Sequence, residues 1–134
     1  MKKDIDFSPV TGVELVVTRS EIEGDDAQWD VYLINKNLIE LEKVMITSKG
    51  YGLVNGEEKK TSVLRHVIEK IEEQSYARIE PIQPELFKLN NEYWVSYYII
   101  DQIFDKKFVF VPESIQNETL QYIPELDLMG VRHA

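Results

Sequence analysis

The chain has 134 residues, 24 of them acidic and 15 basic, with a net charge of −9 and no cysteine. This length predicts a single domain over residues 1–134, and the missing cysteines exclude disulfides, thiolate zinc sites and a cysteine nucleophile. The negative charge argues against a nucleic-acid partner, and the absence of a long apolar run argues against a membrane partner. We therefore expect a cytoplasmic protein.

The first half of the chain is predicted to consist of short strands. Residues 1–11 are polar and are expected to be loosely held. Stretches rich in β-branched and aromatic residues predict strands over Val13–Arg19, Trp29–Asn35 and Val44–Lys49. The Asn55-Gly56 dipeptide then predicts a type I′ turn, because both residues tolerate positive φ.

The segment after that turn carries two conflicting patterns. Val63, Val67 and Ile71 have helical spacing, whereas Leu64, His66 and Ile68 alternate as in a strand. The turn upstream favours a strand over Thr61–Ile68. The alternative is a helix near residues 61–73, which would make the fold α+β.

A further strand over Tyr76–Ile82 leads to a hairpin over Tyr93–Val111, with Asp101-Gln102 as the predicted loop. In that register Ile100 faces Ile103 and Trp94 faces Val109. One face of the hairpin is nearly all apolar and should point to the core: Tyr93, Val95, Tyr97, Ile99, Phe104, Lys106, Phe108 and Phe110.

About seven short strands with regular turn signals predict an all-β fold, an antiparallel immunoglobulin-like β-sandwich. The tail over residues 112–134 is apolar, but Pro124 and Gly130 argue against one continuous helix. We expect this tail to dock on the domain or on a partner.

No catalytic residues, metal ligands or cofactor are predicted. His66 and His133 are the only histidines, and neither lies in a metal-ligand pattern. His66 is expected to be a packed or surface strand residue. The sequence carries no phosphate-binding glycine loop and no nucleophile motif, so we expect a protein that is not an enzyme.

The outward face of the Tyr93–Val111 hairpin is the candidate interaction surface. It should carry Trp94, Tyr98, Ile100, Ile103 and Val109, with Val111 at its end. Large aromatic patches mark interfaces, because Trp and Tyr are enriched at binding hot spots. We expect a second subunit or the chain's own tail to cover this face.

Four stretches resemble a family of small uncharacterised bacterial cytoplasmic proteins, over residues 10 to 125. They are Asp30–Asn37, Thr47–Gly52, Asn90–Ser96 and Asp105–Phe108. Members of this family are sometimes labelled as a phenylalanyl-tRNA synthetase subunit, but this chain lacks the class II synthetase motifs. The resemblance therefore implies a bacterial cytoplasmic setting and no mechanism.

Two functions follow from the sequence. The first is a non-catalytic β-sandwich interaction module with a protein partner, and a homodimer is the case in which the partner is a second copy. The second is a small-molecule binder or enzyme that uses buried carboxylates or tyrosines. A flat aromatic patch favours the first function, and a polar pocket favours the second.

Overall fold

The computed structural model describes residues 11–22 and 24–134, and the predicted loose segment over residues 1–11 lies outside this part except for Thr11. The strands are β1 (Val13–Arg19), β2 (Trp29–Asn35), β3 (Leu41–Val54), β4 (Glu57–Lys60), β5 (Leu64–Ile71), β6 (Ser75–Pro81), β7 (Asn90–Ile99), β8 (Gln102–Phe110), β9 (Gln121–Ile123) and β10 (Leu128–His133). Three short 3₁₀ helices lie between them: η1 (Gly24–Asp26), η2 (Pro84–Lys88) and η3 (Asn117–Thr119).

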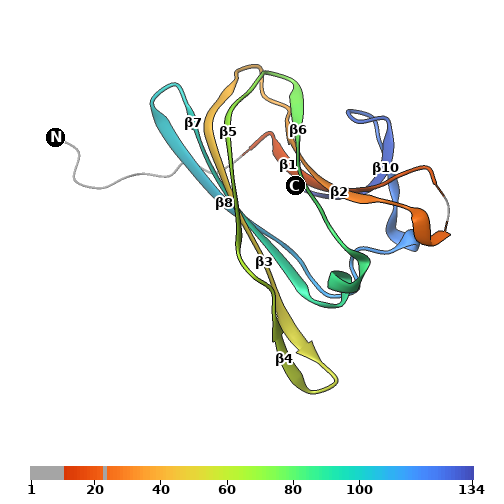
Figure 1. Cartoon of the computed structure of the whole chain (residues 1–134). Helices are drawn as coiled ribbons and strands as arrows, with labels where there is room; N and C mark the ends of the chain where they lie inside the picture. Colours follow the sequence, from red (N-terminus) through yellow and green to blue (C-terminus); the bar gives the residue numbers. More distant parts are fainter. Residues whose placement is uncertain (1–10, 23) are drawn as a thin grey trace.

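The strands form two antiparallel sheets that pack against each other (Figure 1). The first sheet has the order β6-β2-β1-β10-β9, and the second has the order β4-β3-β7-β8 with β5 also paired to β3. The predicted all-β sandwich is confirmed, with ten described strands where the sequence predicted about seven. In this strand order the first strand pairs with the last, whereas an immunoglobulin constant domain has the orders ABED and CFG.

The segment with two conflicting patterns forms a strand, as the turn upstream predicted, but over Leu64–Ile71 and not over Thr61–Ile68. Asn55 and Gly56 have φ values of 53° and 81°, so the β3–β4 connection has the positive φ values of a type I′ turn. After this turn β4 and then β5 both pair with the long strand β3. The tertiary pairing overrides the helical spacing of Val63, Val67 and Ile71.

The β7–β8 hairpin has the predicted faces in a different register. The turn residues are Ile100 and Asp101, and Ile100 takes a φ of 55°. Trp94 therefore pairs with Lys107, and not with Val109 as predicted. The error is two residues, and side chains alternate with a period of two, so the residues within the two strands kept their predicted faces, whereas Ile100 lies in the turn.

The core lies between the two sheets. Tyr93, Tyr97 and Phe108 are its largest fully buried side chains, and Leu15 and Leu33 reach it from the first sheet. The rings of Tyr97 and Phe104 stack with their centroids 5.4 Å apart. The inward side chains of the second sheet pack in this apolar layer, and the outward side chains of the same strands face away from it.

The C-terminal tail belongs to the first sheet. β10 pairs with β1, and β9 pairs with β10. The His133 ring packs perpendicular to the Phe108 and Phe110 rings, at 5.3 and 5.6 Å between centroids. The tail therefore adds strands to the first sheet, and Trp94 on the second sheet is 45% exposed.

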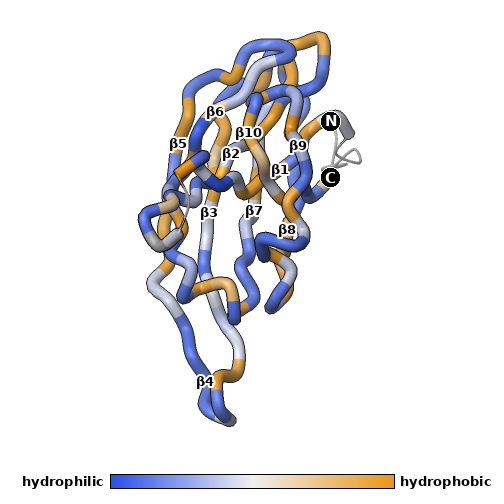
Figure 2. The backbone as a smooth tube through the Cα atoms, turned by 90° about the vertical axis from the view of Figure 1, so that its right-hand side faces the viewer, coloured by the Kyte–Doolittle hydropathy of each residue, from blue (hydrophilic) through white to orange (hydrophobic). Residues whose placement is uncertain are grey.

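The β3–β4 hairpin extends away from the body of the sandwich, and its strand β4 is hydrophilic (Figure 2). Beyond Tyr51, β3 pairs only with β4. Within the residues that the structure describes, no helix has the length and apolar character needed to cross a membrane.

Candidate interaction surface

The outward face of the second sheet gathers side chains from four strands around Trp94. In the register of the sheet, Arg65 on β5, Thr47 on β3, Trp94 on β7 and Lys107 on β8 form one row. The next row consists of Val67, Met45, Ser96 and Asp105. We call these two rows, with Lys49, Val63, Glu92 and Val109 beside them, the Trp94 face.

The structure brings together most of the side chains that the sequence assigned to this surface. Trp94, Tyr98, Ile103 and Val109 lie on the predicted outward face, although the last three are half-buried. Ile100 is 69% exposed but lies in the turn, roughly 20 Å along the strand from Trp94. Val111 is exposed, directly after β8.

Three exposed apolar residues of this face were missed by the sequence analysis. Met45 is 54% exposed, Val67 is 74% exposed and Val63 is 45% exposed. They belong to β3 and to the segment around β5, and their position beside Trp94 depends on pairing between distant strands. The alternation of buried Val44 and Ile46 in β3 was the available signal, because it places Met45 outward.

A buried carboxylate holds the centre of the face in place. Glu92 lies 3.6 Å from the ammonium of Lys49 and 4.0 Å from that of Lys107, and it accepts a 3.3 Å hydrogen bond from Tyr51. Burial and the neighbouring Glu92 charge raise the pKa of Tyr51. Lys107 also lies 5.6 Å from the centre of the Trp94 ring, in cation–π geometry. Lys107 therefore links the Trp94 ring to the Glu92 cluster.

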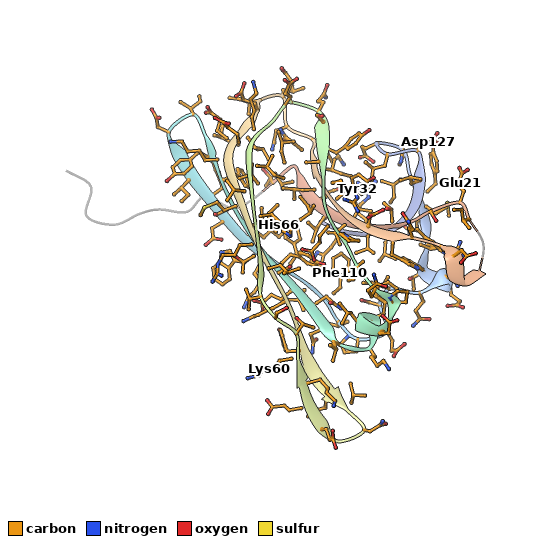
Figure 3. The ribbon with its side chains drawn as sticks, in the orientation of Figure 1. Glu21, Tyr32, Lys60, His66, Phe110 and Asp127 are labelled. Atoms are coloured by element: carbon orange, nitrogen blue, oxygen red, sulfur yellow. The ribbon has the colours of Figure 1, made fainter. Side chains whose placement is uncertain are left out.

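A second polar cluster lies between the sheets and centres on Glu80 of β6. Its carboxylate accepts hydrogen bonds from Ser48 at 2.9 Å and from Tyr93 at 3.3 Å, and His66 Nε2 lies 2.6 Å from it. Figure 3 labels His66 on β5, the edge strand of the second sheet. Glu80 thus connects β6 of one sheet to three strands of the other.

The Glu80 cluster lacks the geometry of a nucleophilic site. Ser48 donates its hydroxyl to the carboxylate and not to His66, so the imidazole is not placed to take its proton. Among the residues that the structure describes, no three His, Asp or Glu side chains gather as metal ligands. The contacts of Glu80 fit a structural role, in which its carboxylate connects the two sheets.

Raising the pH above 10 is expected to destabilise the fold through its buried tyrosines. Burial raises the pKa of Tyr97 to about 12. Burial, and to a smaller extent the charge of Glu80, also raise the pKa of Tyr93. The unfolded tyrosine loses its proton near pH 10, so the free energy of unfolding falls by about 1.4 kcal/mol per pH unit for each such group. Urea unfolding of wild type and Tyr97→Phe from pH 8 to 11 measures this. Equal slopes for the two proteins would contradict it.

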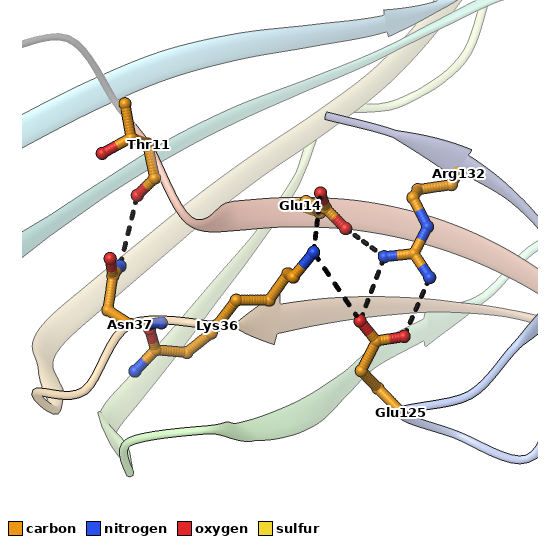
Figure 4. A network of polar contacts seen from close by, with 7 residues as sticks. Thr11, Glu14, Lys36, Asn37, Glu125 and Arg132 are labelled. Atoms are coloured by element: carbon orange, nitrogen blue, oxygen red, sulfur yellow. Dashed lines mark hydrogen bonds and ion pairs between the residues drawn. The ribbon is translucent and has the colours of Figure 1, made fainter.

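An ion-pair network fastens the last strand to the first sheet (Figure 4). The guanidinium of Arg132 on β10 contacts Glu14 on β1 and Glu125 in the β9–β10 turn, and Lys36 lies 3.7 Å from Glu14. The hydrogen bond from Arg132 lowers the pKa of Glu125. The network therefore supports the position of the C-terminal tail.

Replacing Arg132 by methionine is expected to lower the free energy of unfolding by about 1–2 kcal/mol at pH 7, because Glu14 and Glu125 lose their charged donor. The deficit should shrink as the pH falls through the lowered pKa of Glu125, since its protonated carboxyl group no longer needs a cation. Urea unfolding at pH 7 and pH 4 measures both effects. A deficit that stays constant with pH would show that the charges do not matter.

Comparison with known proteins adds little to this geometry. No family model matches the chain, and no curated protein matches it. A solved structure of Spo0M, the sporulation control protein from Bacillus subtilis, aligns with a TM-score of 0.32 and 9% sequence identity. The alignment covers 76% of this chain and 49% of that protein, so this chain spans about half of its length.

Proposed function

We propose that this protein is a non-catalytic interaction module that binds a partner protein through the Trp94 face. The observation that carries the proposal is the 45% exposure of Trp94 at the centre of a rigid sheet face, beside exposed Met45 and Val67. Aromatic anchors surrounded by apolar and charged side chains are typical of protein interfaces. A cytoplasmic setting, as expected from the sequence, is part of this proposal.

The local charge favours a different protein over a second copy of the chain. Arg65, Lys49 and Lys107 outnumber the carboxylates of the Trp94 face, Glu92 and Asp105, by one, and Lys49 and Lys107 both lie beside Glu92. Two copies meeting through this face would bring the same cations together. The homodimer predicted from the sequence therefore becomes the second candidate.

A small-molecule binder or enzyme is the other candidate from the sequence. Glu80 and Tyr93 are a buried carboxylate and a buried tyrosine, as that candidate requires. Their polar atoms bond to each other and to Ser48 and His66, so these atoms already have partners within the chain. This arrangement supports the interaction module.

A pull-down experiment that compares wild type with two matched variants tests the proposal. Trp94→Ala should weaken binding of the protein that wild type retains by at least tenfold, because truncating a central aromatic anchor costs about 2 kcal/mol or more. Tyr122→Ala is the matched control, since Tyr122 is 56% exposed on the first sheet. Equal retention by wild type and Trp94→Ala would reject the proposed surface.

A further inference from the structure

Two adjoining open hollows lie on the second sheet, and we call the two together the groove. One of about 500 Å³ lies beside Trp94, Met45 and Arg65, and the other of about 860 Å³ lies along the β3–β4 hairpin beside Lys60. Both are lined by Lys49, Val63 and Glu92, so the two are contiguous. The groove follows β3 from Met45 to Leu53, roughly 26 Å of extended chain.

The groove has a small excess of positive charge on a protein that is strongly negative. Its four cations are Lys49, Lys59, Lys60 and Arg65, and they outnumber by one the carboxylates of Glu58 and Glu92 in the lining and of Glu57 beside Lys59. Lys49 is paired with Glu92, and Lys59 lies 3.3 Å from Glu57. In the part of the chain that the structure describes, Lys60 and Arg65 have no ion-pair partner, and the net charge of the whole chain is −9. The local excess of cations complements an anionic partner.

We propose that this groove binds an extended, acidic segment of the partner protein, with an apolar side chain of that segment resting on Trp94. This inference rests on the proposed interaction module and names the chemistry of its partner. An extended segment matches the length of the groove. The carboxylates of the segment would lie beside Lys60 in one hollow and Arg65 in the other, and its apolar residue would pack on Trp94 and Met45.

The test measures binding of fluorescein-labelled eight-residue peptides by anisotropy. The first probe has glutamates on both sides of a central phenylalanine, the second replaces the glutamates by lysines, and the third replaces the phenylalanine by glycine. The full chain should bind the first probe at least tenfold more tightly than either of the others. The affinity for the first probe should fall as salt is added, because the contacts with its glutamates are screened.

Charge reversal at the groove supplies the variant and its control. The double variant Lys60→Glu with Arg65→Glu should weaken binding of the first probe at least tenfold, because it removes both unpaired cations. Lys70→Glu with Lys88→Glu changes the net charge equally at exposed positions outside the groove and should bind as wild type does. Circular dichroism confirms that each variant is folded.

Several results would overturn the inference. They are equal binding of the lysine probe, an unchanged affinity of the groove variant, and a wild-type dimer in sedimentation that buries Trp94. The failure of the inference is distinct from that of the proposed function. A partner that is lost with Trp94→Ala, but retained by the groove variant and not displaced by the acidic peptide, keeps the interaction module and removes the acidic segment.

Discussion

Replacing Glu80 by alanine is expected to lower the free energy of unfolding by about 3 kcal/mol or more. The Glu80 carboxylate accepts hydrogen bonds from Ser48 and Tyr93, which are 4% and 2% exposed, and it pairs with His66. Each buried hydroxyl left without a partner costs about 1–3 kcal/mol, and the removed side chain leaves a cavity. Urea unfolding followed by far-UV circular dichroism measures the loss.

Two further variants separate the hydrogen bonds of Glu80 from its bulk. Glu80→Gln keeps the size and one acceptor oxygen, so its loss should be clearly smaller than that of Glu80→Ala. Glu73→Ala removes an exposed carboxylate and should change the free energy of unfolding by less than about 0.5 kcal/mol. If Glu80→Ala unfolds at the same urea concentration as Glu73→Ala, the bridge between the sheets contributes nothing.

Replacing Gly130 by alanine is the second large expected effect, with a loss of about 2–3 kcal/mol. Gly130 is buried on β10, and an added Cβ would lie 2.8 Å from the carbonyl oxygen of Val17 and 2.9 Å from Val16 Cγ1. Because the first of these atoms belongs to the backbone, β10 itself would have to move away from β1. Thermal unfolding should show a lower midpoint for this variant.

The neighbouring residue Met129 supplies the control for Gly130. Met129→Ala changes an exposed side chain of the same strand and should shift the midpoint only slightly. A Gly130→Ala protein as stable as Met129→Ala would mean that β10 has room to adjust. The close approach of β10 to β1 would then be unimportant for the position of the tail.

The β7–β8 hairpin shows which parts of the fold were readable in the sequence. Alternation of apolar residues predicted the buried faces of Tyr93, Tyr97 and Phe108 correctly, because burial determines which side of a strand is apolar. The register was wrong because a turn of Ile100 and Asp101 requires positive φ at an isoleucine, which local propensity disfavours.

The Glu80 cluster and the wider Trp94 face could not be read from local patterns. Glu80 meets His66 and Ser48 only because three strands from two sheets converge on it, and nothing in the spacing of these residues indicates that contact. Met45 and Val67 join Trp94 for the same reason. The tail was recognisable as apolar, but its pairing with β1 at the other end of the chain was not.

Hydroxyl-radical footprinting of the captured complex tests the central claim most directly. Met45 and Met129 are 54% and 43% exposed on different sheets, so they serve as matched probes within one chain. We predict that a bound partner protects Trp94 and Met45 from oxidation and leaves Met129 and Tyr122 as reactive as in the free protein. Protection of Met129 and Tyr122, with Trp94 and Met45 still oxidised, would contradict binding through the Trp94 face.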